Sequence, residues 1–239
     1  VMVLITSFLI LLTYKFQANP DTQINTGILS LVGLSNFYLL YLKNNYFNSF
    51  DQSVFEHTWS LSIEFQFYLI YPIFLLILFK FFKNKINLYF YSLIFILSIF
   101  LIYNIFFEHN LFYHTGTRIW EFIVGCLTFF LYKKRVFKNY FIVFFYILSL
   151  VVFYFTQDIF YLIVFVCFLS SFIILNYNNF YSLKLILNNK MLCYIGNISY
   201  SLYLWHLPVI YFANTFFSGL DYYFFSILFS SILSILSYY

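Results

Sequence analysis

The chain carries little charge for its length. Only 8% of its 239 residues are Asp, Glu, Lys or Arg, whereas 64% are hydrophobic. A soluble domain carries roughly 25% charged residues, so this composition excludes a protein whose whole surface faces water. It also excludes an intrinsically disordered chain, which needs few apolar residues. The sequence therefore predicts a protein surrounded by a lipid bilayer.

Cysteine is scarce as well. Cys126, Cys167 and Cys193 lie far apart in apolar stretches without CxxC spacing, and we interpret them as small buried hydrophobic residues. The histidines show neither HxxxH nor HExxH spacing. We expect His109 and His114 to be solvated loop residues. We therefore expect no disulfide, no bound metal or other cofactor, and no nucleic-acid partner.

A basic leader segment is absent too. The sequence begins VMVLITSFLILL and ends SILFSSILSILSYY, so both ends lie within apolar runs. A signal peptide has basic residues before its apolar segment, and none precede this one. We expect a fragment of a longer protein that forms a single membrane-embedded domain over residues 1–239. We expect truncation at its N-terminus and leave open whether its C-terminus is cut as well.

Long apolar runs are what the sequence has in abundance. They occupy residues 1–14, 27–42, 59–79, 87–107, 118–132, 139–156, 158–176, 191–217 and 222–239. Because backbone groups in lipid must form hydrogen bonds within the chain, we expect these runs to be helices. The predicted fold class is all-α: a polytopic transmembrane helix bundle with about eight or nine apolar segments. The number depends on whether residues 27–42 span the membrane or form a re-entrant piece.

The polar breaks between these runs differ in charge. Basic residues gather in three breaks: Lys80, Lys83 and Lys85; Lys133, Lys134, Arg135 and Lys138; Lys184 and Lys190. The breaks near residues 51–56, 108–117, 157–158 and 218–221 hold no such cluster. The two kinds alternate along the chain, and basic loops of membrane proteins stay in the cytoplasm. We therefore expect a multi-pass protein with its lysine-rich loops inside.

Polar residues interrupt the run HTWSLSIEFQFYLIYP at residues 57–72. On a helix, His57, Ser60, Glu64 and Tyr68 share one face, which predicts a polar stripe that faces the bundle interior. An ionisable residue within a membrane is costly and is a functional candidate for that reason. The alternative is a hydrogen-bonded network that only joins helices. Trp59 could equally be an anchor at the membrane interface.

A second polar stretch is TGTRIWEFIVG at residues 115–125. Arg118 and Glu121 are three residues apart, so on a helix they are neighbours and can pair. Arg118 could instead extend to lipid headgroups. Glu121 lies deeper in the run, where a carboxylate needs a partner.

A third polar stretch is GNISYSLYLWHLPVIYF at residues 196–212. Ser199, Tyr203 and His206 lie on one side of a helix. Pro208 kinks the helix or ends a turn just after His206, which frees backbone groups that a pocket can use. A buried histidine can also be no more than a hydrogen-bonded core residue.

Together these stretches resemble the acyltransferase 3 family, the multi-pass bacterial O-acyltransferases that modify envelope glycans. Its members carry a motif similar to HTWSLSVEEQFYLxxP, matched at residues 57–72. A TRxWEL-like element is matched at residues 117–122 and an SYSLYLWHxP element at residues 199–208. The segment SNFYLLY at residues 35–41 also fits the family's order. Three motifs in this order over most of the chain make the resemblance specific.

The chain departs from the family pattern in two ways. Phe65 replaces the second Glu of the motif, which leaves open a degenerate, non-catalytic member, whereas Ile63 for Val is a minor change. The family's Arg-x10-His helix and Arg-x-x-Arg segment are absent from this sequence. The family assigns a general base and acyl-CoA contacts to those segments, so neither role passes to any residue here. The residues of the TRxWE and SYSLYLWHxP motifs also resemble the family subgroup that continues into an extracytoplasmic SGNH-type domain.

The resemblance implies a transferase that moves an acyl group, most commonly acetyl, from acyl-CoA to a hydroxyl of an envelope polysaccharide or lipid-linked sugar. It implies the bacterial cytoplasmic membrane as the location. Our hypothesis is that one group of residues serves catalysis and a second binds substrate in the same cavity. The catalytic group is Glu64, His57, Arg118 and Glu121; the substrate-binding group is Trp59, Ser60, Tyr68, Tyr203 and His206. We expect the ring groups of His57, Tyr203 and His206 to donate hydrogen bonds, and residues 1–239 alone to be inactive.

Two other classes of protein stay open at this point. A proton-coupled transporter uses intramembrane Glu, Arg and His residues as well, although the sequence has no inverted repeat. A helix bundle with a structural or polymer-extruding role is the other possibility. An Arg-x10-His segment ahead of Val1 in the complete reading frame would favour the transferase.

Overall fold

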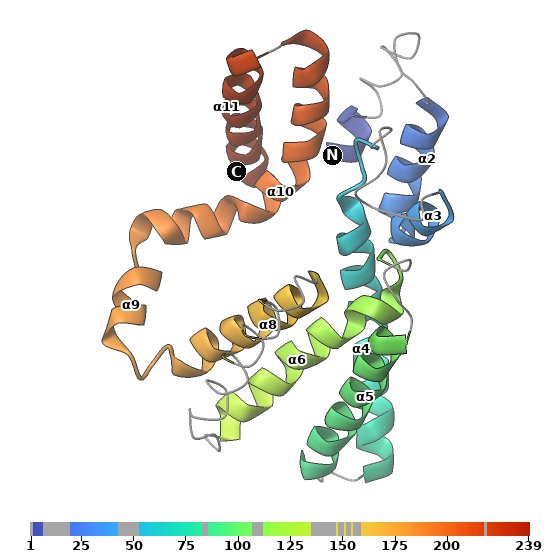
Figure 1. Ribbon diagram of the computed structural model, residues 1–239, viewed down its shortest axis with the longest axis vertical. Coiled ribbons are helices and arrows are strands. Elements are labelled where there is room, and N and C mark those ends of the chain that lie inside the picture. Colours follow the sequence, from blue (N-terminus) through green and yellow to red (C-terminus); the bar gives the residue numbers. More distant parts are fainter. Residues whose placement is uncertain are drawn as a thin grey trace. The chain divides into compact units, whose positions relative to one another are not determined.

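The computed structural model describes residues 2–6, 20–42, 53–82, 86–106, 112–134, 147, 151, 154, 159–217 and 219–239. All regular structure within these ranges is helical, as the sequence predicts. The principal helices are α2 (Pro20–Leu31), α3 (Ser35–Leu42), α4 (Thr58–Phe82), α5 (Ile86–Phe106), α6 (Thr115–Lys134), α8 (Ile159–Asn176), α9 (Tyr181–Leu187), α10 (Lys190–Phe216) and α11 (Gly219–Tyr238) (Figure 1).

Two of the described helices are long and apolar enough to cross a membrane. They are Thr58–Phe81 within α4 and Asp221–Tyr238 within α11. Residues Phe160–Asn176 and Tyr181–Leu187 make a third candidate if the pair, bent by 106° at its break, counts as one span. The described residues thus support two or three spans, and eight or nine segments remain a prediction. The runs 1–14 and 139–156 lie mostly outside the described residues.

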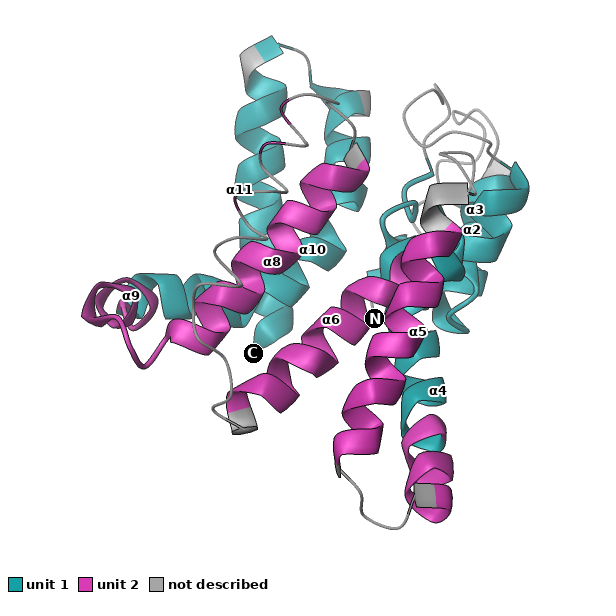
Figure 2. Ribbon diagram, turned by 60° about the horizontal axis from the view of Figure 1, so that its bottom comes forward, with its two compact units in different colours: residues 1–73, 107–117, 190–239 teal, residues 74–106, 118–189 magenta. Residues whose placement is uncertain are grey.

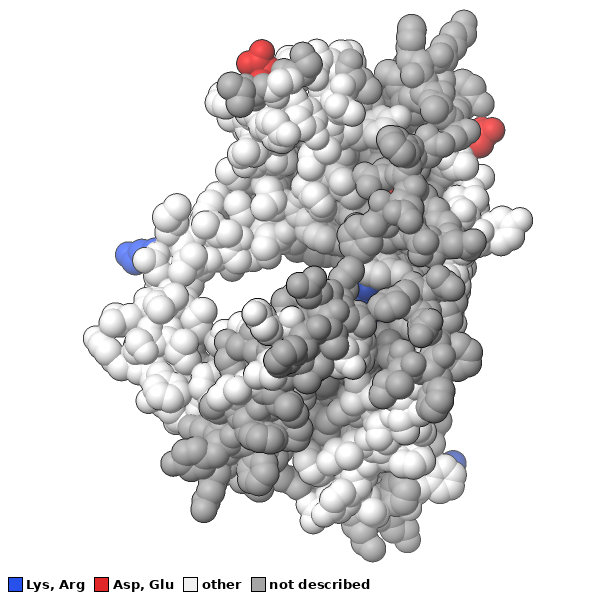
Figure 3. Space-filling model, viewed as in Figure 1, with Lys and Arg blue, Asp and Glu red and all other residues white. Residues whose placement is uncertain are grey.

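The surface of the described residues is apolar, as lipid contact requires. Leu69, Ile73 and Leu76 on α4 have 57%, 53% and 70% of their surface exposed. A soluble monomer rarely exposes such a contiguous apolar area. Figure 3 shows the charged side chains of the described residues only as isolated points on the displayed face. The exposed aliphatic side chains of α4 are therefore suited to contact acyl chains.

The chain divides into two compact units (Figure 2). The first comprises residues 1–73, 107–117 and 190–239, and the second comprises residues 74–106 and 118–189. Helices α4 and α6 each have their first residues in the first unit and their remainder in the second. Each unit is described by itself below.

A glycine turn joins α2 to α3 in the first unit. Pro20 and Asp21 begin α2, where a missing N–H costs nothing and a negative charge favours the helix N-terminus. The helix ends at Leu31, and Gly33 in the following turn has a φ of 73°, the left-handed conformation that glycine adopts easily. Two backbone bonds close this turn, from Gly33 N–H to Ser30 and from Leu34 N–H to Leu29.

The same turn packs closely on α4. A Cβ atom at Gly33 would lie 2.5 Å from Cδ1 of Phe65, so only a glycine allows this approach. The Gly33 carbonyl also accepts a hydrogen bond of 2.8 Å from Nε2 of Gln66. On α2, Gly27 leaves room in the same way for the ring of Phe55. These contacts fix α2, α3 and the start of α4 as one packed group.

Helices α10 and α11 form a hairpin in the first unit (Figure 1). Ser226, Ser230 and Ser234 make a buried stripe of small side chains along α11. Small residues let membrane helices approach closely. The indole Nε1 of Trp205 donates a hydrogen bond of 3.1 Å to the hydroxyl of Ser237. Residues Tyr203–His206 thus lie on a segment of α10 that its contacts with α11 hold in place.

In the second unit, α6 and α8 run in the same direction. Trp120 and Phe160, near the start of each helix, have ring centroids 5.8 Å apart. Further along, the hydroxyl of Thr128 donates to Ser171 at 2.9 Å. Parallel helices are what the alternating loop charges predict for these two segments.

Candidate functional site

The structure brings four of the expected site residues together in the first unit. We name His57, Ser60, Tyr203 and His206 the His57 cluster. The rings of His57 and His206 have centroids 5.1 Å apart, and those of His57 and Tyr203 lie 5.3 Å apart. His57 is 3% exposed. The cluster therefore joins the start of α4 to the middle of α10.

The Tyr203 hydroxyl is the centre of the hydrogen bonds in this cluster. It donates to the backbone carbonyl of His57 at 2.6 Å and lies 2.6 Å from the hydroxyl of Ser60. Because the phenol proton is used on the carbonyl, Ser60 is the donor to the phenol oxygen. Tyr203 thus holds the first turn of α4.

The rings of His57 and His206 carry their protons on different nitrogen atoms. Nε2 of His57 lies 3.2 Å from the carbonyl of Leu204, and Nδ1 of His206 lies 2.6 Å from the carbonyl of Tyr203. A carbonyl oxygen only accepts, so the nitrogen in each pair carries the proton. A neutral His57 ring has one N–H, and the Leu204 carbonyl already accepts it. The ring can therefore offer a ligand only an acceptor atom, whereas the sequence led us to expect a donor.

Burial keeps the His57 ring neutral. The pKa of His57 is lowered from its ordinary 6.5 to about 4, first by burial and second by the neighbouring charge of His206. The backbones of Leu204 and Val54 act in the opposite direction. His57 directly precedes the apolar span that begins at Thr58. At neutral pH this residue is therefore an uncharged imidazole.

Glu64 and Tyr68 extend the same face of α4 beyond the cluster. The Tyr68 hydroxyl donates to Oε1 of Glu64 at 2.6 Å, and Tyr68 is 62% exposed. The Glu64 carboxylate also interacts electrostatically with the hydroxyl of Tyr203. Glu64 is half-buried and so lies at the edge of the cluster, where a substrate could reach it.

Two expected residues lie apart from the cluster. Trp59 packs against Phe112 and Tyr113, with ring centroids 5.0 Å and 5.8 Å away. The hydroxyl of Ser199 is exposed and donates to the carbonyl of Gly196 within its own helix.

A buried amide network, which sequence reasoning missed, lies on the opposite side of α4. Nε2 of Gln66 donates to Oδ1 of Asn36 at 2.9 Å, and the Thr115 hydroxyl donates to Oε1 of Gln66 at 2.7 Å. Nδ2 of Asn36 donates to the carbonyl of Tyr113 at 3.2 Å. Asn36 is 0% exposed. Asn36 and Gln66 are polar residues within apolar runs but are not ionisable, so the criterion that selected Glu64 does not select them.

Sequence reasoning also missed a buried carboxylate, that of Glu56. Glu56 is 2% exposed and accepts a hydrogen bond of 2.6 Å from the hydroxyl of Tyr113. The sequence places Glu56 in a polar break, where exposure is expected. Next to it, the hydroxyls of Ser35, Thr58 and Ser62 form a buried chain with distances of 3.1 Å and 2.7 Å. The segment before α4 is therefore inside the first unit.

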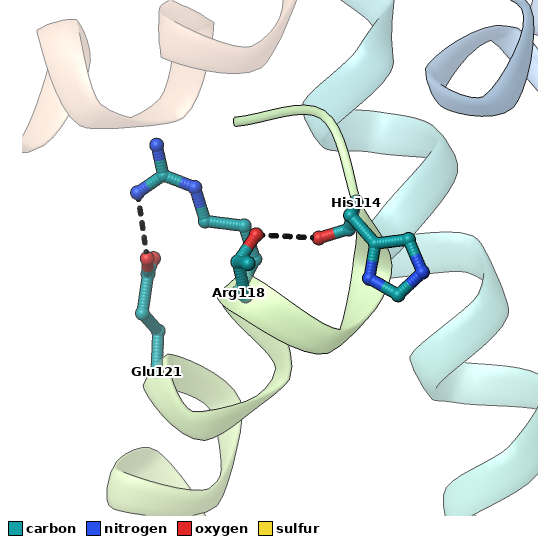
Figure 4. A network of polar contacts seen from close by, with 4 residues as sticks. His114, Arg118 and Glu121 are labelled. Carbon is teal, nitrogen blue, oxygen red and sulfur yellow. Dashed lines mark hydrogen bonds and ion pairs between the residues drawn. The ribbon is translucent and has the colours of Figure 1, made fainter. Parts of the chain in front are cut away.

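Arg118 and Glu121 form an ion pair on α6, as their spacing predicts. Nη1 of Arg118 lies 3.0 Å from Oε1 of Glu121, and the two side chains are 12% and 29% exposed (Figure 4). Both residues belong to the second unit. The two residues of the pair lie within one turn of one helix.

His114 lies in the loop before α6, as expected, and is half-buried there because it caps the N-terminus of the helix. Its Nδ1 accepts a hydrogen bond of 3.1 Å from the backbone N–H of Gly116. Its carbonyl accepts from the hydroxyl of Thr117 at 2.7 Å (Figure 4). A side-chain acceptor at this position satisfies a helix N–H that has no partner in the helix. His109 lies outside the described residues.

The described residues hold no group of three or more His, Cys, Asp or Glu side chains that could bind a metal ion. Cys126 and Cys167 are half-buried, whereas Cys193 is exposed, which differs from the burial expected for all three.

The chain is similar to O-acetyltransferases over most of its length. Over 233 residues the chain is 28% identical to O-acetyltransferase OatA of Staphylococcus aureus (strain NCTC 8325 / PS 47), which covers 87% of this chain and 38% of that protein. Over 216 residues it is 31% identical to a putative O-acetyltransferase of Staphylococcus aureus (strain COL), which covers 80% of this chain and 35% of the relative. The chain thus spans little more than a third of the length of these relatives. No solved structure matches it.

The match to a protein family covers the chain from end to end. The family model, described as an acyltransferase domain, matches residues 1–239. The His57 cluster, Glu64 and the Arg118–Glu121 pair all come from the three motifs that carry the resemblance. The chain belongs to the acyltransferase 3 family.

Proposed function

We propose that the protein is part of a membrane O-acyltransferase. It transfers an acyl group, acetyl in the simplest case, from acyl-CoA on the cytoplasmic side to a hydroxyl of an envelope polysaccharide or lipid-linked sugar. Membership of the family and the O-acetyltransferase names of its relatives support the reaction class. The location that we propose is the cytoplasmic membrane of a bacterium, crossed several times.

The observation that carries the proposal is the His57 cluster. It gathers ring and hydroxyl groups from α4 and α10, which are 146 residues apart at the bond between Tyr203 and His57. Buried polar groups are costly unless they are hydrogen-bonded, and this cluster satisfies most of them while it keeps Glu64 at its edge. Such a cluster inside an apolar protein is a candidate reaction site.

In the proposed reaction, the sugar oxygen attacks the thioester carbonyl. A C–O bond forms, the C–S bond breaks, and the hydroxyl proton passes through a base to the leaving thiolate. The reaction needs a proton acceptor, a donor to the developing oxyanion and the exclusion of water. We assign Glu64 and His57, which carry acceptor atoms, to the binding and orientation of the sugar hydroxyl. Ser60, Tyr68, Tyr203 and His206 complete the substrate-binding face.

Arg118 and Glu121 are assigned to the same reaction as a separate element. The charges of Arg118 and Glu121 balance within one helix. We assign this ion pair the role of presenting a positive and a negative group at fixed positions to a substrate. The test of this assignment is independent of the test for Glu64.

Replacement of Glu64 tests the proposal. In the complete protein, Glu64→Ala should abolish glycan O-acetylation while the amount of protein in the membrane stays unchanged. Asp221→Ala, at the exposed start of α11, is the matched control and should keep full acetylation. The proposal fails if Glu64→Ala acetylates the glycan as well as the unmodified protein does.

A further inference from the structure

A proline in α10 changes the backbone opposite His57. Pro208 lies inside the helix and is fully buried. Proline has no N–H, so it cannot donate the helical hydrogen bond to the carbonyl four residues earlier, which is that of Leu204. This carbonyl instead faces Nε2 of His57 at 3.2 Å. The histidine of one helix thus supplies the donor that the other helix lacks.

This contact determines where the ring of His57 carries its proton. Because the Leu204 carbonyl needs a donor, the neutral ring is the Nε2–H tautomer and its lone pair is at Nδ1. Nδ1 is buried and forms no well-aligned hydrogen bond with a described residue, although the Val54 backbone lies close enough to raise the pKa of the ring. The neighbouring His206 uses Nδ1–H on the carbonyl of Tyr203, so the two adjacent rings are opposite tautomers.

We propose that Pro208 is a positioning residue of the site. By leaving the Leu204 carbonyl without a helical donor, Pro208 holds His57 in the Nε2–H form and keeps an acceptor atom at Nδ1. The Tyr203 hydroxyl holds the His57 backbone carbonyl at the same time. Side chain and backbone of His57 are thereby fixed by consecutive residues of α10. In a neutral ring fixed this way, Nδ1 can take a hydrogen bond from a hydroxyl group.

The catalytic consequence rests on the proposed function, whereas the tautomer does not. If His57 orients a sugar hydroxyl through Nδ1, the wrong tautomer would turn this acceptor into a donor. A misplacement of about 1 Å in a site can cost on the order of 100-fold in rate. We therefore expect Pro208→Ala to lower kcat about tenfold, because residue 208 regains an N–H that competes for the Leu204 carbonyl.

The tautomer is measured by nitrogen NMR of the complete protein, labelled on its histidine rings and reconstituted in lipid nanodiscs. The His57 signals are identified by their loss in His57→Gln. In the unmodified protein they should report a neutral ring protonated at Nε2. In Pro208→Ala they should report a mixture of tautomers. Pro72→Ala is the matched control, because Pro72 is also inside a helix but exposed, and it should leave the His57 signals unchanged.

A second pair of variants keeps the test decisive if Pro208→Ala folds poorly. A Gln side chain reaches as far as Nε2 and can donate to Leu204, whereas an Asn side chain reaches only as far as Nδ1. His57→Gln should therefore accumulate normally and His57→Asn should not. The proposal is overturned by a single unchanged tautomer in Pro208→Ala, by an equal change in Pro72→Ala, or by equal stability of the Gln and Asn variants. If the tautomer shifts but the unmodified protein acetylates no glycan, the proposed function fails and the positioning role stands.

Discussion

The His57 cluster and the Arg118–Glu121 pair satisfy polar groups in opposite ways. The ion pair forms within one turn of α6, between residues three apart. The cluster requires contacts between α4 and α10 across 146 and 147 residues. A local pair survives wherever its helix forms, whereas the cluster exists only when the first unit has packed. The His57 cluster, unlike the ion pair, therefore forms only together with the tertiary structure of the first unit.

Part of this difference could be predicted from the sequence. Helical periodicity is local, so the pairing of Arg118 with Glu121 followed from their spacing. His57, Tyr203 and His206 were recognisable as polar residues in apolar runs. Their partners were not, because which carbonyl His57 meets depends on how α10 packs on α4.

Burial of the segment before α4 could not be predicted at all. Glu56 stands in a polar break that looks exposed, yet the fold places it inside with Tyr113. His114 likewise caps α6 although no common capping residue type marks the position. In both cases a tertiary or backbone partner determined the environment, and hydropathy carries no information about such partners.

The largest effect is expected from the amide network that supports the cluster from the other side of α4. Asn36→Leu removes the three hydrogen bonds that the buried Asn36 amide makes with Gln66, Thr115 and the carbonyl of Tyr113, and it should lower the free energy of unfolding by about 3 kcal/mol. Chemical unfolding in detergent micelles measures it. Asn25→Leu, on the exposed side of α2, is the control and should change stability by less than about 0.5 kcal/mol. Equal stability of the two variants would show that the network is dispensable.

A smaller effect is expected from acidification, which acts on the cluster. The pKa of His57 is lowered to about 4, so the unfolded chain takes up a proton near its ordinary 6.5 before the folded protein does. Stability should therefore fall as the pH drops from about 7 to 5, by about 2 kcal/mol from this residue. Unfolding curves of the unmodified protein and His57→Gln measure the difference. If both lose the same stability over this range, His57 is not the titrating group.

The next largest change in the free energy of unfolding is expected at the Gly33 turn. Gly33→Ala places a side chain at a positive φ and against the ring of Phe65, so it should cost about 1.5 kcal/mol. Gly125→Ala in α6 is the matched control, because its Cβ meets no atom within 4 Å. In a helix this change stabilises by up to about 1 kcal/mol. The thermal midpoints of both variants should therefore move in opposite directions, and a shared direction would contradict the packing of this turn.

The smallest effect on stability is expected from the local pair. The exchange Arg118→Glu with Glu121→Arg keeps both charges one turn apart and should change the free energy of unfolding by less than about 0.5 kcal/mol. If the charges are placed for a substrate, the exchanged protein should nevertheless lose glycan acetylation. Full acetylation by the exchanged protein would reduce the pair to a structural role.

The sharp bend after α8 has a consequence for how the protein meets the bilayer surface. An axis that turns by 106° from a membrane-crossing direction runs nearly flat along the headgroups. On the flat segment, α9, Leu185 and Ile186 are 59% and 57% exposed, and Lys184 stands beside them. Apolar side chains with an adjacent ammonium suit the boundary between acyl chains and phosphates. Where α8 runs across the membrane, this bend would lay α9 along the bilayer surface and limit how far α8 enters the membrane.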